Sequence, residues 1–157
     1  MRLSSYSDYA LRILIFLAVQ PEGLPTIAEI ADRYSISKNH LMKVAHQLGV
    51  GGYVETVRGR GGGLRLGKPA EKIGLGDVVR FTEQDLAIVE CMGTDNECLL
   101  TPSCALKGVL GEALQAFLAV LDEYTLADIV RQKRSLTTLL GLPYDQAAMS
   151  SAGPKNS

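Results

Sequence analysis

Residues 26–66 constrain the fold of this chain more than any other segment, because they indicate two helices, a short turn and a glycine-rich hairpin in that order. Thr26 and Glu29 have the spacing of a capping box, so a helix is expected to begin there. The next helix has Ser37 as a suitable N-cap, and its apolar residues recur at steps of three and four: Leu41, Val44, Ala45 and Leu48. Two short strand patterns, Tyr53–Val57 and Gly63–Leu66, then flank a glycine-rich tip.

Two further helices are expected on either side of this segment. Ser5 and Asp8 also have capping-box spacing, so a first helix is expected to begin at Ser5 and to continue to Val19. Its apolar density predicts burial on more than one side. Leu75–Phe81 is expected to form a short helix with Asp77 in its first turn.

The longest helix is expected over residues 103–124. Thr101 supplies an N-cap and Pro102 a first helical residue, which places Cys104 in the first turn. Apolar residues then follow a narrow seam, as in a helix that pairs with its own copy, and these are Leu106, Leu110, Ala113, Phe117, Val120 or Leu121, and Tyr124. The chain is therefore expected to be a homodimer. A third capping box, Thr125 to Asp128, begins a short final helix.

Charge is unevenly distributed along the chain. The formal net charge is −1, yet residues 38–72 contain seven basic residues and two acidic ones. A helix with lysine and asparagine on its N-terminal half can enter the major groove of DNA, and an arginine-bearing hairpin beside it can contact phosphates or the minor groove. The alternative is a solvated basic face, but the order of elements and the clustered arginines favour DNA. The expected DNA-binding residues are Thr26, Ser37, Lys38, Asn39, His40, Lys43, Arg58, Arg60, Gly61, Gly62 and Arg65.

All three cysteines of the chain, Cys91, Cys98 and Cys104, fall in one short segment. Their Cys-x6-Cys-x5-Cys spacing differs from the Cys-x2-Cys pairs of structural zinc sites, and cysteine thiolates are the ligands of iron–sulfur clusters. The alternatives are three structural cysteines, a zinc site, or a thiol–disulfide switch without metal. A metal centre is favoured, and metal analysis under anaerobic conditions would separate it from the thiol switch.

Three thiolates leave one position of such a centre to a weaker ligand. His40 and His46 are better explained as residues of the DNA-facing helix. A carboxylate or amide oxygen would exchange readily at this position, and the residues alone do not distinguish Asp8 from Asp95, Asn96 or Glu97. Asp8 also has an ordinary structural explanation as the acid of a capping box.

The elements divide the chain into four parts. Residues 1–82 are expected to form a mainly α-helical, winged helix-turn-helix DNA-binding domain with a small β-hairpin wing. Residues 83–104 would form the cluster-binding loop, and residues 105–142 the dimerisation helix with a short C-terminal helix. Residues 143–157 lack periodicity and are expected to be disordered.

A cytoplasmic location is expected for this chain. The N-terminal residues do not have the pattern of a signal peptide, and the apolar run Ile13–Val19 is too short to span a bilayer. An odd number of cysteines in that setting favours metal or redox chemistry over disulfides.

Taken together, several motifs resemble those of the IscR/NsrR/RirA family of iron–sulfur winged-helix transcriptional repressors. The resemblance covers about residues 1–142 and is carried by Met1–Arg12, Ser37–Lys43, Val57–Pro69, the three cysteines and Tyr124–Asp128. It implies a homodimeric repressor that binds a double-stranded DNA operator. It also implies that the three cysteines hold an iron–sulfur cluster, 4Fe-4S being favoured over 2Fe-2S.

Within this family the chain is most similar to the nitric-oxide-sensitive NsrR branch. IscR-like members have a histidine three residues after the third cysteine, where this chain has Lys107. NsrR-like members have an aspartate at the position of Asp8, and the resemblance implies that Asp8 from the other subunit completes the cluster. Nitrosylation of the cluster by nitric oxide would then release the operator. RirA-like repressors, which respond to iron or iron–sulfur status, are the alternative.

An electron-transfer or redox-enzyme component is a hypothesis of a different class. The sequence contains no nucleotide-binding loop and no second cluster motif, and this hypothesis leaves the basic hairpin unexplained. The chain is therefore not expected to be an enzyme, and operator binding distinguishes the two classes.

Overall fold

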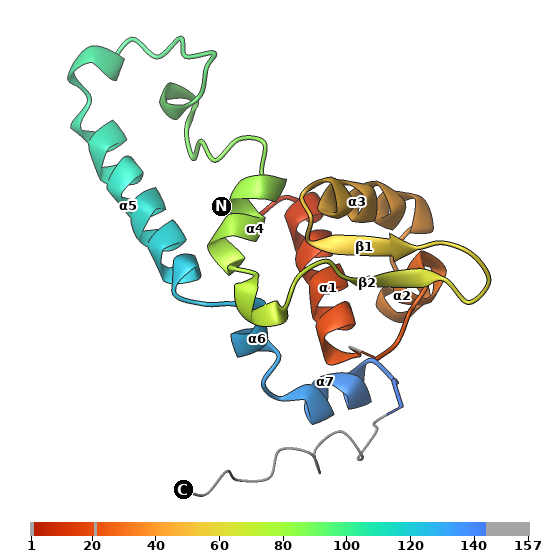
Figure 1. Cartoon of the computed structure of the whole chain (residues 1–157). Helices are drawn as coiled ribbons and strands as arrows, with labels where there is room; N and C mark the ends of the chain where they lie inside the picture. The colour runs from red at the N-terminus through yellow and green to blue at the C-terminus, as the bar shows by residue number, and fades with distance from the viewer. Residues whose placement is uncertain (1, 21, 144–157) are drawn as a thin grey trace, which may run out of the picture.

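A compact head of helices and one hairpin carries a long projecting helix (Figure 1). The structure is a computed structural model that describes residues 2–20 and 22–143. In chain order its helices and strands are α1 (Ser5–Val19), α2 (Ile27–Tyr34), α3 (Lys38–Val50), β1 (Val54–Val57), β2 (Gly63–Leu66), α4 (Leu75–Thr82), α5 (Ala105–Asp122), α6 (Leu126–Ile129) and α7 (Lys133–Leu139). This order confirms the mainly α-helical winged helix-turn-helix fold expected from the sequence.

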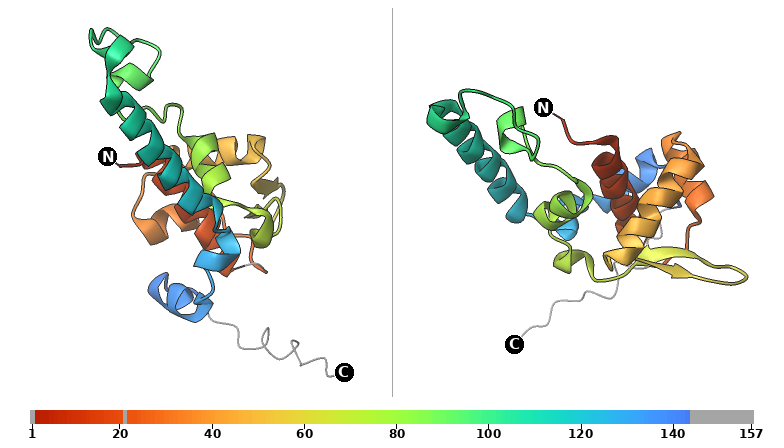
Figure 2. Two further views of the ribbon diagram at one scale, coloured as in Figure 1. Left: turned by 90° about the vertical axis from the view of Figure 1, so that its left-hand side faces the viewer. Right: turned by 90° about the horizontal axis from the view of Figure 1, so that it is seen from above.

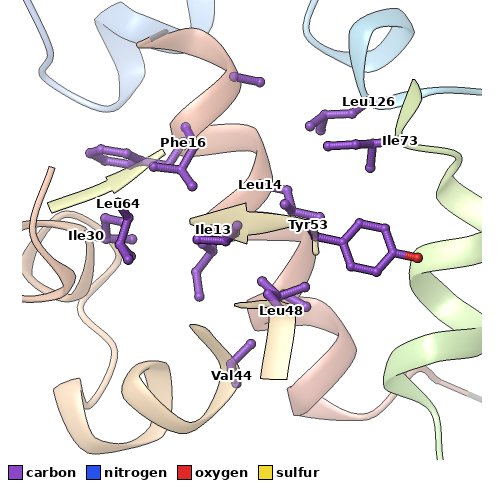
Figure 3. Packing of buried hydrophobic residues seen from close by; sticks show 14 of the residues in the cluster. Ile13, Leu14, Phe16, Ile30, Val44, Leu48, Tyr53, Leu64, Ile73 and Leu126 are labelled. Atoms are coloured by element: carbon purple, nitrogen blue, oxygen red, sulfur yellow. The ribbon is translucent and has the colours of Figure 1, made fainter. Parts of the chain in front are cut away.

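The centre of the head is α1, which is buried from several sides as its apolar density predicts. Ile13 and Leu14 are fully buried, and Phe16 is 1% exposed. Figure 3 shows these side chains packed among residues of the surrounding elements, including Ile30, Val44, Leu48, Tyr53, Leu64, Ile73 and Leu126. Helices α2 and α3, the hairpin and α6 therefore share one core with α1.

The helix-turn-helix forms as its caps predict. Thr26 and Glu29 make a complete capping box at the start of α2. Ser35 ends α2 in the left-handed region, with φ 52°, and the chain turns directly into α3. Helix α3 runs through Gly49 to Val50 with Gly51 as its C-cap, and β1 begins at Val54 instead of Tyr53. The hairpin is antiparallel, with Val57 opposite Gly63.

A second, smaller cluster joins α5 to the head. Val79 of α4 packs against Leu114 and Leu118 of α5. Arg80 donates two hydrogen bonds of 2.6 Å to the two carboxylate oxygens of Asp122. Beyond these contacts α5 extends away from the head, as Figures 1 and 2 show.

The chain returns to the head directly after α5. The backbone N–H of Leu126 donates to the carbonyl of Ile73, at 2.8 Å, and that of Leu75 donates to the carbonyl of Tyr124, at 2.9 Å. The third capping box, Thr125 to Asp128, is present as predicted. The base of α5 is therefore attached to the start of α4 by backbone as well as by side chains.

The start and the buried face of the longest helix differ from expectation. Thr101–Ser103 forms a separate 3-10 turn and Cys104 has extended backbone, so α5 begins at Ala105 and Cys104 is its N-cap. The buried residues of α5 are Leu114 and Leu118, because they meet α4. Of the predicted seam, Leu110, Phe117 and Leu121 are half-buried, whereas Leu106, Ala113, Val120 and Tyr124 are exposed.

From residue 144 onward, the segment predicted to be disordered lies outside the described residues. Among the helices that are described, none combines the length and the apolar character needed to cross a bilayer.

Candidate nucleic-acid interface and metal centre

One face of α3 is polar and exposed, while the opposite face builds the core. Leu41 and Leu48 are fully buried and Val44 is 2% exposed. The residues predicted to face DNA, which are Lys38, Asn39, His40 and Lys43, are all exposed. Ser37, at the N-cap, is also exposed and makes no capping hydrogen bond with its side chain. The first turn of α3 therefore presents a set of donors suited to base edges and phosphates.

The hairpin tip adds two arginines on the side of the molecule where α3 begins (Figure 1). Arg58 and Arg60 are exposed and form no ion pair within the described residues. Gly61 has φ 74°, and a Cβ on Gly62 would lie 2.1 Å from the carbonyl oxygen of Val57. The tight tip therefore requires glycine. Figure 1 shows the hairpin tip and the N-terminal end of α3 on the same side of the molecule.

Two other predicted DNA-binding residues have structural partners. Arg65 lies across the hairpin from Glu55, and its Nε donates to the carboxylate at 2.9 Å. The hydroxyl of Thr26 donates to Glu29 at 2.9 Å and accepts the Glu29 N–H as part of the cap. Hydrogen bonds from the Thr26 backbone and hydroxyl hold the pKa of Glu29 below its usual value. Contact with DNA by Arg65 or Thr26 stays a prediction.

The cysteines lie on the loop that connects α4 to α5. Cys91, Cys98 and Cys104 are free thiols and all three are half-buried. Cys91 belongs to the 3-10 turn Glu90–Met92. Among the described residues, no three His, Cys, Asp or Glu side chains are gathered closely enough to hold a metal ion. The loop therefore brings the three thiols into one region of the molecule without assembling them.

Local hydrogen bonds shape the loop around Cys98. The Cys98 N–H donates to the side-chain oxygen of Asn96, at 3.0 Å, and Thr101 donates to the carbonyl of Cys98, at 2.8 Å. Glu90 accepts the N–H of Glu97 at 2.9 Å. The Asn96 oxygen is thus engaged in the turn, which makes it a poorer candidate for the fourth ligand than its position in the sequence suggests.

Asp8 does not cap α1, so its predicted capping box with Ser5 is wrong. Ser4 is the N-cap, and its hydroxyl accepts the N–H of Ser7 at 3.2 Å. The carboxylate of Asp8 instead lies 3.0 Å from the guanidinium of Arg12, and its side chain is 47% exposed. Asp8 is therefore an accessible carboxylate whose structural contributions are a surface ion pair and a place in the first turn of α1, where its charge complements the helix dipole.

Arg12 connects this carboxylate to the helix-turn-helix. Its guanidinium lies 5.7 Å from the centre of the Tyr34 ring, and the Tyr34 hydroxyl donates to the Arg12 carbonyl at 3.1 Å. Burial raises the pKa of Tyr34 to about 12, so this hydroxyl remains a donor at neutral pH. Asp8 on α1 is thus two contacts away from the last residue of α2.

A polar junction ties the start of α1 to the end of α4. Ser7 and Thr82 are 0% and 5% exposed, and their hydroxyl oxygens are 2.7 Å apart. Glu83 accepts the backbone N–H of Ser4 at 2.7 Å. Sequence reasoning missed this junction, although the spacing of Ser7 with Ala10 and Leu14 on the buried face of α1 implied that Ser7 needs a buried partner. The root of the cysteine loop and the helix that carries Asp8 therefore form one unit.

A family model named Rrf2, described as an iron-dependent transcriptional regulator, matches residues 3–132. The chain belongs to the Rrf2 family. It is therefore a DNA-binding transcriptional regulator, and its relatives are regulators, not enzymes.

Relatives that match most of the chain bear the name HTH-type transcriptional regulator NsrR. The protein from Bacillus subtilis is 58% identical over 142 residues, which cover 89% of this chain and 97% of that protein. The protein from Halalkalibacterium halodurans is 49% identical over 144 residues, which cover 90% of this chain and 99% of that protein. The family resemblance expected from the motifs is confirmed.

Solved structures of other Rrf2 regulators have the same fold. CymR (YrzC), the global cysteine regulator of B. subtilis, superposes with a TM-score of 0.67 at 31% identity, over 82% of this chain and 95% of its own. T. potens IscR superposes with a TM-score of 0.70 over 96% of each chain, and its 24% identity supports the fold alone.

The donors of this Rrf2 chain fit an iron–sulfur cluster by their chemistry. Three unpaired thiols lie on one loop, and the hydrogen bonds around Cys98 join residues of the loop itself, while Met92 beside Cys91 packs against the hydrophobic cluster of α4 and α5. Thiolate sulfur is the ligand that such clusters require. Asp8 is not gathered with these thiols in its own chain, whereas Asp95 and Glu97 lie on the same loop, so the source of a carboxylate ligand stays a prediction.

Proposed function

We propose that this chain is a homodimeric iron–sulfur repressor that releases its operator in response to nitric oxide. The observation that carries the proposal is the set of three unpaired thiols on a loop rooted in the DNA-binding head, in a chain that is 58% identical to a regulator named NsrR. Lys107 in place of the histidine of IscR-like repressors, together with Asp8, favours this branch.

Cys91, Cys98 and Cys104 would hold the cluster, and Asp8 of the partner subunit would complete it. When bound, the cluster supplies iron atoms with which nitric oxide reacts. Asp8 supplies a ligand that exchanges easily, because a carboxylate oxygen binds iron of this kind less firmly than a thiolate. A 4Fe-4S cluster is favoured over a 2Fe-2S cluster, and the site would lie in the cytoplasm.

A chain of contacts would couple a change at Asp8 to the DNA-binding helix α3. Asp8 and Arg12 form an ion pair, and Arg12 contacts Tyr34 at the end of α2, one short turn before α3. A carboxylate engaged by the partner subunit would leave Arg12, so α1 and the helix-turn-helix would sit differently in the two states. A coupling of about 1–3 kcal/mol changes operator affinity roughly 5–150-fold.

The DNA-binding surface would combine the first turn of α3 with the hairpin. Ser37, Lys38, Asn39, His40 and Lys43 would enter the major groove. The hairpin residues Arg58, Arg60, Gly61, Gly62 and Arg65 would lie against the backbone or the minor groove, with Thr26 at the start of α2 near a phosphate.

Dimerisation would use the exposed apolar side of α5. Leu106, Val109 and Val120 are 61%, 60% and 56% exposed, which is costly for a helix that remains single. Pairing of two α5 helices would place the two heads to read a two-fold symmetric operator.

Titration of anaerobically prepared protein tests the proposal. Nitric oxide and an iron chelator are added separately, while cluster absorbance and binding to a duplex selected from a random library are followed. We expect operator release at low nitric oxide stoichiometry. Colourless protein that still binds the operator would contradict the cluster. The description of the family as iron-dependent favours one alternative, an iron-responsive repressor, which would respond to the chelator and not to nitric oxide.

A further inference from the structure

Two adjacent leucines on the cysteine loop are almost fully exposed. Leu99 is 94% exposed and Leu100 is 71% exposed, directly after Cys98. A pair of large aliphatic side chains in water is unfavourable, and such a pair usually marks a contact surface. The exposure of Leu99 also means that it has no substantial contact with its own chain.

A hollow of about 370 Å³ lies at the start of α1 and includes Asp8 in its wall. The other lining residues are Arg2, Leu3, Ser5 and Leu11. Leu3 and Leu11 are half-buried and give it apolar walls, while Arg2 is exposed at its edge. The hollow therefore combines apolar walls, the cationic side chain of Arg2 and the carboxylate of Asp8, which is proposed as the fourth ligand.

We propose that Leu99 and Leu100 of one subunit seat in this hollow on the partner subunit. Aliphatic side chains match its apolar walls, and Arg2 of the partner subunit complements Asp95 and Glu97, two exposed acids that precede the leucines on the loop. The occupant is a second copy of this chain because exposed apolar residues follow the two leucines along the chain into the first turns of α5, at Leu106 and Val109, where the proposed dimer contact begins.

The contact positions the fourth ligand. Consecutive Cα atoms are about 3.8 Å apart, so seating Leu99 in the hollow carries the neighbouring Cys98 towards the partner's Asp8. The two leucines are thus positioning residues: they hold the loop against the partner's α1 by apolar contact, independently of iron. This inference rests on the proposed dimer with Asp8 shared between subunits.

A photo-reactive side chain at position 99 tests the contact directly. Leu99 is replaced by p-benzoylphenylalanine in the full-length chain, which is irradiated anaerobically with its cluster and after chelation. We expect covalent dimers on a denaturing gel, with crosslinks that map by mass spectrometry to residues 2–11 of the partner. The same probe in place of Arg2 should reach residues 95–100 of the partner.

Position 139 provides the matched control, because Leu139 on α7 is 83% exposed and lies away from the loop. The probe there should give no crosslink to residues 2–11. Crosslinks from position 99 that stay within one chain, reach another surface of the partner or capture an unrelated protein would overturn the proposal.

A paired substitution gives a second readout. The double variant Leu99→Ser/Leu100→Ser keeps all three cysteines and Asp8, yet it should lose cluster absorbance about tenfold faster on exposure to chelator, since the loop is no longer held. An unchanged rate would contradict the positioning role. Crosslinks to residues 2–11 in a protein without a cluster or a nitric oxide response would uphold the contact and refute the proposed function. A normal nitric oxide response with crosslinks elsewhere would uphold the proposed function and refute the contact.

Discussion

Asp8 forms an ion pair with Arg12 and is proposed as a cluster ligand, but it does not cap α1. Ser4 caps α1, whereas Asp8 forms an exposed ion pair with Arg12. Exposed ion pairs contribute about 0–1 kcal/mol, and loss of an N-cap costs about 1 kcal/mol. Asp8→Ala should therefore leave the free energy of unfolding almost unchanged while cluster stability or nitric oxide reactivity changes.

Ser4→Ala is the matched control for this prediction, because it should lower the free energy of unfolding by about 1 kcal/mol and leave cluster chemistry unaltered. Urea unfolding and cluster absorbance, measured on both variants, separate the two roles. If Asp8→Ala destabilised the fold as much as Ser4→Ala and bound its cluster normally, Asp8 would be a structural residue only.

The same residues explain why the N-cap of α1 was assigned one position too late, although the helix itself begins at Ser5 as predicted. Ser4 and Ser5 are both suitable caps, and only Ser5 has an acid three residues later. Tertiary contacts decide between them, because Glu83 accepts the N–H of Ser4 and Thr82 pairs with Ser7. The capping boxes that begin at Thr26 and Thr125 have no competing serine beside them, and both were predicted correctly.

At the scale of elements, the buried hydroxyl pair of Ser7 and Thr82 attaches α1 to the end of α4, where the cysteine loop begins. The Thr82 hydroxyl donates to the carbonyl of Val78, at 2.9 Å, so the oxygen of Thr82 is the acceptor for the buried hydroxyl of Ser7. Thr82→Val removes that acceptor and should destabilise the fold by about 1–3 kcal/mol.

Adding Ser7→Ala to Thr82→Val should recover part of this loss, since no buried donor then lacks its partner. Urea unfolding of the two single variants and the double variant measures the coupling. Strictly additive losses would mean that the two hydroxyls are stabilised independently and do not join α1 to α4.

The buried face of a helix was predicted correctly where its apolar residues form a single stripe. Helix α3 has one apolar stripe, so its buried and exposed sides followed from spacing alone. Helix α5 has leucines on several sides, and its contact with Val79 of α4 selects Leu114 and Leu118 as the buried pair. The arrangement of the cysteines was not accessible in this way, because a loop has no periodicity and its shape depends on local bonds such as those of Asn96.

At the scale of the whole molecule, α4 is the element that joins α1, α5 and the cysteine loop. It receives α1 through the hydroxyl pair, receives α5 through the Arg80–Asp122 ion pair and continues directly into the cysteine loop. The hydrogen bond from Arg80 holds the pKa of Asp122 below its usual value, so this attachment persists at neutral and mildly acidic pH. Movement of the loop root would therefore disturb its contacts with α1 and α5.

The basic residues concentrated in residues 38–72 predict how DNA affinity depends on salt concentration. Binding would release about 0.9 counterions for each phosphate that the protein contacts on duplex DNA, so the loss of one contact lowers the slope of log affinity against log salt by about 0.9. Arg60 is exposed and forms no ion pair within the described chain, whereas Arg65 is already paired with Glu55. Arg60→Ala should reduce the slope by about 0.9, and Arg65→Ala should reduce it less.

Fluorescence anisotropy with a labelled operator at several salt concentrations measures these slopes. Arg131→Ala is the control, because Arg131 lies beyond α6, is paired with Asp128 and is far along the chain from the hairpin. Its slope should match that of the unaltered protein. An Arg60→Ala slope equal to that of the unaltered protein would remove Arg60 from the phosphate contacts.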